Sequence, residues 1–426
     1  MASNFDSNFT RLLARVFVDK FESSRVLSKN VNTQLLTGKF NPASGENVDF
    51  KRPTDYTSSR SPTGDATGIG DDIITGKATG TVQDYFTTLI PFNEADEAIK
   101  MDQLDELLAP AATRIVTDLE LDFAAFMMKN SGLLAGTYGT AVSTWAHVAE
   151  AGSVMQSAGV PGDAPWCYTV NPYTQTSLAS NQRSLGAGGA AGTLISESIR
   201  KATVMENFAG FDGVMTGTTL DSYTSATTGD LVGAFSASPD VTYVTAKDSM
   251  TQSWALDSFG TFTGTIPAGT VVQITGVNRL NLSTRQPVIN ASGANVAFSA
   301  VTTADATFTS GAGTLIVSGP AIFESGGSYN TVDSAPVNND VVTILGADTT
   351  LYQPNLFWHR DAFSIGSVPI KKLFSTDTLA TTEDGLQLRV SKFSDGLTNV
   401  QSVRFDLRPA YGVMNPFFSG QGWGSA

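Results

Sequence analysis

Histidine and cysteine, the side chains with the most versatile chemistry, are scarce in this chain. It contains two histidines, His147 and His359, far apart in sequence, and one cysteine, Cys167. Two distant histidines are too few to build a Ser-His-Asp triad or a zinc site. One cysteine permits neither a disulfide framework nor a thiolate metal cluster. Between Trp166 and Tyr168, we interpret it as a small buried apolar residue.

A glycine-rich stretch and a group of carboxylates are the next candidates for chemistry. The stretch "GAGGAAGT" at residues 186–193 has the composition of a phosphate loop, but its glycines lack the G-x-G-x-x-G spacing and no strand closely precedes it. We expect a flexible loop there. Asp118, Glu120 and Asp122 are spread around one expected helix instead of forming a pair. The sequence therefore predicts no catalytic residue, no metal, no cofactor and no enzymatic activity.

Composition and charge exclude several classes of protein. The chain has 426 residues, of which 15% are charged, and a formal net charge of −14. An acidic chain lacks the clustered Lys and Arg that a nucleic-acid groove needs. The N-terminal stretch "MASNFDSNFTRLLARVF" has no unbroken apolar run, and no segment approaches the ~18 apolar residues of a membrane span. We expect a cytosolic protein of two or three domains.

The elements that would position functional residues begin with a helix and a polar arm. Residues 5–29 carry apolar side chains at helical spacing, among them Leu13, Phe17 and Phe21. The pattern leaves open whether this helix packs on a partner or on its own domain. A polar arm follows from Lys39 to Gly80, in which "NVDFKRP" and "DDIITGKA" have the composition to pair as an extended hairpin. A disordered linker is the alternative.

The residue pattern changes twice along the rest of the chain. The strongest helical pattern covers residues 102–130, and we expect its main helix to begin at Pro110, with the proline in the first turn. Residues 131–222 alternate helices with short strands. From residue 226 to 350, Thr-, Ser-, Gly- and Val-rich runs separated by turn residues predict an inserted β-sandwich or small barrel. A hairpin of "LQLRVSKF" and "VQSVRFDL" follows, with alternate residues of its second strand on opposite faces.

The order of these parts resembles a known family. A helical N-terminal arm, an extended two-stranded arm, a long helix, an α/β region with a β insertion and a closing hairpin follow one another in the major capsid protein of tailed bacteriophages. More narrowly, the chain resembles the coat proteins of short-tailed lambdoid phages, whose capsid fold carries an inserted immunoglobulin-like domain. The stretches that carry the resemblance are "QLLTGKFNPASGENVDFKRP", "SPTGD", "ITGKATG", "EAIKMDQLDELLAP", "RIVTDLELDFAAFMM", "PNLFW", "GSVPIKKL" and "VRFDLRPAYGVMNP".

The resemblance implies an α+β capsid fold, shared with encapsulins and the herpesvirus capsid floor, with an inserted all-β domain that is immunoglobulin-like or a barrel. It also implies a division into segments. These are an N-terminal helical arm at 1–38, an extended loop at 39–80, a peripheral domain with a spine helix at 81–130, an axial domain at 131–225 and 351–374, the β insertion at 226–350, and a peripheral hairpin and C-terminus at 375–426.

The implied function is that of a structural major capsid protein. Pentamers and hexamers of the chain would assemble with a scaffolding protein, in the host cytoplasm, into an icosahedral procapsid. The shell would hold a portal protein and would expand as it encloses double-stranded DNA, which it does not read by sequence. The alternatives are an encapsulin-like compartment shell and a surface-layer or adhesin β protein.

The resemblance also assigns candidate contact residues. In this family the extended loop lies across a neighbouring subunit, so its charged residues become candidates for inter-subunit pairs: Lys51, Arg52 and Arg60 as cations, Asp65, Asp71 and Asp72 as anions. The N-terminal helix offers Asp6, Asp19 and Glu22 as acidic contacts for a basic segment of the scaffolding protein.

Overall fold

The chain is described by a computed structural model, which places residues 5–37, 45, 47–58, 60–65, 67, 72–93, 104–186, 201–202, 204, 207–225, 230–346, 350–374, 377–395 and 400–425. It forms two compact units, each assembled from three separate stretches of sequence. Unit 1 comprises Met1–Asp49, Thr79–Ala124 and Phe363–Gly412. Unit 2 comprises Phe50–Ala78, Ala125–Ala362 and Val413–Ala426.

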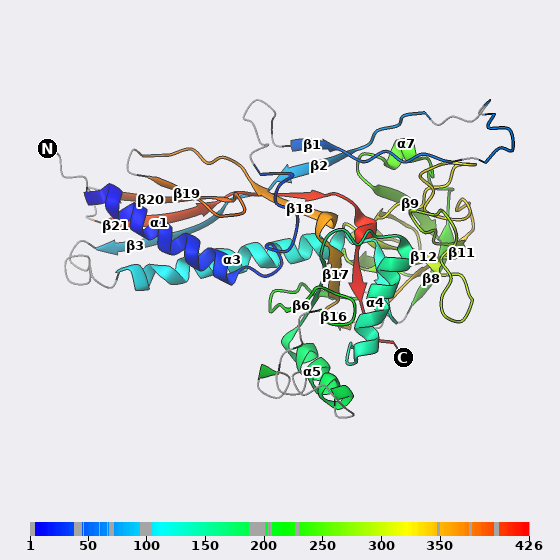
Figure 1. The fold of residues 1–426 in the computed structure, drawn as a ribbon, viewed down its shortest axis with the longest axis horizontal. Helices are drawn as coiled ribbons and strands as arrows, with labels where there is room; N and C mark the ends of the chain where they lie inside the picture. Colours follow the sequence, from blue (N-terminus) through cyan, green and yellow to red (C-terminus); the bar gives the residue numbers. More distant parts are fainter. Residues whose placement is uncertain are drawn as a thin grey trace. The chain divides into compact units, whose positions relative to one another are not determined.

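Unit 1 is built on an antiparallel sheet in the order β19-β20-β21-β3, covered on one face by helix α1. The elements are α1 Phe5–Ser24, β3 Phe86–Asn93, β19 Thr378–Thr381, β20 Gln387–Asp395 and β21 Val400–Leu407. Figure 1 shows α1 against these strands. Its apolar stripe is buried, and the rings of Phe17 and Phe405 lie 4.9 Å apart. The N-terminal helix therefore packs on its own chain, which answers the question that the sequence left open.

The opposite face of this sheet holds a buried carboxylate. Asp406 accepts hydrogen bonds from Arg389, at 2.6 and 2.9 Å, from Arg404 at 2.7 Å, and from the Thr87 hydroxyl at 2.6 Å. Phe405, the neighbouring residue, packs against Phe17 of α1 instead, so the predicted alternation between Phe405 and Asp406 is confirmed. The buried charge is stable because two guanidinium groups and a hydroxyl replace the water that it loses.

The N-terminal helix is shorter than the apolar pattern predicted, because a carboxylate on the long helix α3 (Leu104–Lys129) interrupts it. Glu120 accepts the backbone N–H groups of Leu27, at 2.6 Å, and Ser28, at 3.0 Å, as well as the Ser28 hydroxyl. These N–H groups would otherwise continue the helical hydrogen bonding, so α1 ends at Ser24 and not at residue 29. Arg25 adds a further contact here, because its guanidinium donates to the Asp384 carboxylate at 2.8 Å.

Helix α3 also begins earlier than predicted, so Pro110 lies inside it and not in its first turn. Proline removes one backbone hydrogen bond, and the remaining bonds of a 26-residue helix continue past it. At 1.5 Å per residue, the helix spans about 39 Å.

A second sheet contains four strands in the order β1-β2-β22-β18. Their bounds are β1 Asn47–Lys51, β2 Lys77–Val82, β18 Phe363–Ser367 and β22 Pro409–Val413.

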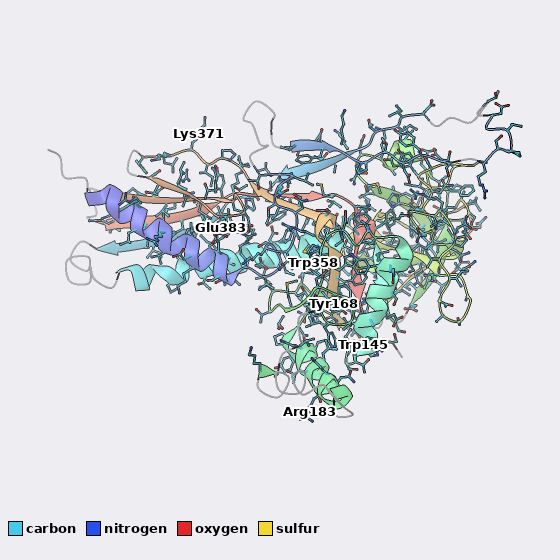
Figure 2. The ribbon with its side chains drawn as sticks, viewed as in Figure 1. Trp145, Tyr168, Arg183, Trp358, Lys371 and Glu383 are labelled. Atoms are coloured by element: carbon cyan, nitrogen blue, oxygen red, sulfur yellow. The ribbon has the colours of Figure 1, made fainter. Side chains whose placement is uncertain are left out.

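The α/β body of unit 2 surrounds a five-stranded sheet in the order β4-β23-β17-β5-β6. Its elements are β4 Leu133–Ala135, α4 Trp145–Ala158, β5 Trp166–Val170, α5 Pro172–Gly186, β6 Gly213–Thr216, β17 Asn355–His359, the short helices η2 Arg360–Ala362 and η3 Pro416–Phe418, and β23 Ser419–Gly422. Trp358 and Tyr168, labelled in Figure 2, come from the paired strands β17 and β5. Helix α4 ends at Ala158, and Gly159 caps it in a left-handed conformation.

The insertion forms a closed six-stranded barrel in the order β11-β12-β14-β9-β8-β15. Of the two alternatives that the sequence offered, the strand pairing is that of a barrel and not of a two-sheet, immunoglobulin-like sandwich. Its elements are β8 Leu231–Phe235, α7 Tyr243–Ala246, β9 Thr251–Asp257, β11 Val271–Asn278, β12 Ala297–Thr302, β14 Gly313–Ser318 and β15 Val341–Ile344, with β10 Gly264–Ile266 and β13 Ala306–Phe308 as a separate pair. Trp254, Phe235, Phe298 and Phe308 fill its core.

The barrel joins the body through a buried arginine. Arg279 donates hydrogen bonds to the carbonyl oxygens of Gly132, at 3.0 Å, and Ser299, at 2.7 Å. Its guanidinium lies over the rings of Phe298 and Phe417, and burial lowers its pKa to about 10. Carbonyl dipoles and ring faces thus take the place of an acidic partner.

Loss of the hydrogen bonds that Glu120 accepts is expected to lower the stability of unit 1. Glu120→Ala removes the acceptor of three buried donors and should lower the free energy of unfolding by about 3–5 kcal/mol. Asp118→Ala is the matched control on the same helix, because it breaks only an exposed pair with Arg114 and should cost about 0.3–0.5 kcal/mol. Denaturant unfolding of the unassembled chain measures both values, and equal costs would contradict the buried role of Glu120.

Candidate assembly interface

The two histidines and the cysteine, which have the most catalytic potential, make contacts that belong to the fold. His359 is buried on β17, where its Nδ1 accepts the Asp361 N–H at 3.2 Å and its Nε2 lies 3.3 Å from an Asp163 carboxylate oxygen. His147 accepts the Ser143 N–H at 3.2 Å. Cys167 is buried, and burial raises the pKa of its thiol to about 12. Within the described ranges, no group of three His, Cys, Asp or Glu side chains could hold a metal ion.

The glycine-rich stretch lies largely outside the described residues, since residues 187–200 have no described placement. None of the helices in the described part of the chain has the length and apolar character that a membrane-spanning helix needs. The polar arm remains as the candidate for function.

The base of the arm is a hairpin, as the sequence predicted. Strands β1 and β2 are neighbours in one sheet, and the Arg52 N–H donates to the Gly76 carbonyl at 2.8 Å just beyond them. Residues 50–78 group with the barrel and the α/β body in unit 2. In Figure 1 this segment runs beside α7 of the barrel. The arm therefore has a fixed base and is not a featureless linker there.

Arg52, expected to pair with another subunit, is turned toward its own chain. Its guanidinium donates to the carbonyl oxygens of Lys77 and Lys247, both at 3.1 Å, and to that of Met414. Burial lowers its pKa to about 10, while the nearby charge of Asp248 acts in the opposite direction. Its donors are thus used inside unit 2, which local sequence could not reveal because the acceptors lie far along the chain.

Four other arm candidates are exposed: Lys51, Arg60, Asp65 and Asp72. Asp65 accepts the backbone N–H of Thr67 at 2.9 Å and its hydroxyl at 2.6 Å, which lowers the pKa of the Asp65 carboxyl. It is held in a charged form within a local turn. Asp71 lies outside the described residues.

Sequence reasoning missed two apolar residues of the arm. Tyr56 is 52% exposed and Ile73 is 74% exposed, on either side of the charged outer part. Single exposed apolar side chains are common on protein surfaces, but in a segment so polar these two are candidates for contact with another protein. The signal was present, because each interrupts an otherwise polar run.

The three acidic residues proposed for a scaffolding protein differ in their surroundings. Asp19 is exposed on α1. Glu22 accepts the Glu383 N–H at 2.8 Å, so part of its hydrogen-bonding capacity is used within unit 1. The side chain of Asp6 lies outside the described residues. Asp19 is therefore the cleanest position at which to test this contact.

Comparison with known proteins decides the family. The sequence model of a family described as "P22 coat protein - gene protein 5" matches residues 1–424. The chain belongs to the P22 coat protein family. A curated relative, the "Major capsid protein" of Acyrthosiphon pisum secondary endosymbiont phage 1, is 35% identical over 431 residues, which cover 100% of both chains. The prediction of a phage major capsid protein is confirmed, and the adhesin and encapsulin-like alternatives are set aside.

Solved structures similar to this coat protein are also phage proteins, at low identity. The "Capsid structure of the Cyanophage P-SCSP1u" is 11% identical with a TM-score of 0.41, covering 90% of this chain and 84% of that chain. A structure from Mycobacterium phage Che8 is 12% identical with a TM-score of 0.41, covering 92% and 89%. A coat protein builds the virion capsid from many copies of itself, so exposed residues of the arm are candidates for contact between copies.

Exposed and inward-facing arm residues should differ in their effect on the monomer. Arg60→Glu and Asp72→Lys change exposed side chains and should alter the free energy of unfolding by less than about 0.5 kcal/mol. Arg52→Ala leaves several carbonyl oxygens without a donor and should cost about 1–3 kcal/mol. Denaturant unfolding of the unassembled coat protein measures these values. A cost for Arg52→Ala no larger than that of the other two would argue against its structural role.

Proposed function

We propose that this coat protein assembles as pentamers and hexamers, through the outer part of its arm, into an icosahedral procapsid templated by a scaffolding protein. The outer arm is defined as residues 57–73. The observation that carries the proposal is its surface: Arg60, Asp65, Asp72 and Ile73 are all exposed, and no residue in the described part of the outer arm is among the buried apolar residues of the core. An arm with so little apolar content is expected to gain most of its contacts from a neighbouring copy.

The contacts of the outer arm suit a shell that must correct its own errors. Each exposed ion pair is worth about 0.2–1 kcal/mol, and full burial of an isoleucine side chain adds about 1.5–3 kcal/mol. One such arm holds a neighbour weakly, so a misplaced subunit dissociates. Because every subunit contributes an arm, the closed shell is stable through the sum of many contacts.

The acidic balance of the chain suits a container for double-stranded DNA. With a net charge of −14, the shell repels the genome weakly and leaves it free to be packed and released. A portal protein would occupy one position of the shell. Expansion of the procapsid would be a rigid-body rearrangement of packed domains, and the role of the chain would be structural and not enzymatic.

Electron microscopy of the purified chain tests the proposed role of the outer arm. The parent chain, expressed with its scaffolding protein, should give closed shells. A variant in which a short Gly-Ser linker replaces residues 57–72 should remain folded, with an unchanged circular dichroism spectrum, and give no shells. The charge-neutral variant Thr57→Ser is the matched control and should assemble as the parent does. Normal shells from the shortened variant would reject the role of the outer arm.

Charge reversal on α1 tests the scaffold contact. Asp19→Lys should reduce co-assembly with the scaffolding protein several-fold at low salt and less at high salt, because an exposed ion pair is screened by ions. Lys20→Glu, next to it on the same exposed side of the helix, is the control of opposite sign and should not reduce binding to a basic segment. Sedimentation of mixtures gives the bound fraction, and equal binding by Asp19→Lys and the parent would exclude this contact.

A further inference from the structure

The inserted barrel carries a small apolar platform under the base of the arm. Tyr243 and Tyr329 stack with ring centroids 3.7 Å apart, and Ile322 is buried beside them. Ile74 of the arm packs against this group. At Gly76 the arm passes so close to the barrel that a Cβ atom would lie 2.4 Å from the Lys247 carbonyl oxygen. Glycine is therefore needed at this crossing.

Polar contacts join both strands of the arm base to the same platform. The Tyr329 hydroxyl donates to the Ile74 carbonyl at 3.1 Å and accepts the Asp55 N–H at 3.0 Å. On the returning strand, the Lys77 N–H donates to Asp248 at 3.1 Å. One tyrosine hydroxyl thus bridges the outgoing and returning strands.

An ion pair completes this contact. Arg285 of the barrel donates to the Asp55 carboxylate at 2.5 Å and to the Asn330 carbonyl at 2.8 Å. Arg285 holds a backbone φ of 54°, a left-handed conformation that is unfavourable for a long side chain. Strained residues of this kind persist where the surroundings over-determine them and often mark functional positions.

We propose that the inserted barrel is the seat of the arm, and that Tyr329, Asp55 and Arg285 form a latch that sets the direction of the outer arm before assembly. This inference rests on the proposed role of the outer arm. A latched base leaves the outer residues free to meet a neighbour while it removes most of the directions in which the arm would otherwise point. Such preorganisation reduces the ordering that assembly must supply, so it acts on the rate and fidelity of shell formation.

The latch also gives the insertion a role in every subunit of the shell. The arm begins after β1 and ends at β2, and residues 50–78 group with the barrel in unit 2. A segment of low apolar content cannot fix its own path, because it has no core of its own. The barrel supplies the missing rigid surface.

Hydrogen exchange of the unassembled, full-length chain tests the latch directly. Tyr329→Phe keeps the stacked ring and removes both hydroxyl contacts, and Arg285→Gln removes the ion pair. Each should raise the exchange rates of amides in residues 54–58 and 73–77 by at least tenfold and leave the barrel strands unchanged. Asp72→Asn, an exposed arm residue outside the latch, is the control. Unchanged exchange in both latch variants would overturn the proposal.

A charge swap and an assembly assay complete the test. Asp55→Arg combined with Arg285→Asp restores a pair of opposite sign and should recover at least part of the protection that either single change loses. The loosened variants should form shells several-fold more slowly than the parent. Assembly at the parent rate despite faster exchange would overturn the direction-setting role. Normal shells from the chain shortened at residues 57–72 would instead reject the proposed function, and the exchange data would still decide whether the latch exists.

Discussion

The two-stranded pair of β7 (Tyr223–Thr224) and β16 (Leu351–Tyr352) is the contact on which the rest of unit 2 depends. The chain enters the barrel just after β7 and leaves it just before β16, and Tyr223 lies opposite Tyr352. Tyr138 bonds the Tyr223 hydroxyl, and Trp423 packs against the Tyr352 ring at 5.7 Å. Because the two ends of the insertion are held side by side, strands of the body from before and after the insertion can join one sheet.

Arg279 provides a second contact between the barrel and the α/β body. The guanidinium is buried, bonds carbonyl oxygens of both the body and the barrel, and lies over Phe417 of the C-terminal segment. Asn281 adds a bond from the barrel to the Ser157 carbonyl at the end of α4. These contacts join the barrel to the α/β body within unit 2, as a seat for the arm requires.

Acidic residues have two different roles in this coat protein, depending on whether they are buried or exposed. Glu120 and Asp406 are buried and tie distant stretches of unit 1 together, where their partners replace the lost water. Asp65 and Asp72 stay exposed on the outer arm, where they contribute nothing to the core. Buried carboxylates resist the loss of a partner strongly, and exposed ones exchange partners at little cost. The buried carboxylates thus serve the fold of the chain, and the exposed ones remain available for the proposed contacts between copies.

The sequence by itself determined the type and order of the elements, the polar character of the arm and the family. Helical stripes, strand alternation and turn residues are local patterns, and they survive in the fold as α1, α4, β5 and the β insertion. Only the tertiary structure decided which charge meets which partner. Arg52, Asp55 and Glu120 looked alike as charged residues in polar or helical surroundings, yet each finds its partners across long stretches of chain. Periodicity carries no information about such long-range contacts, because they depend on which surfaces the whole fold brings together.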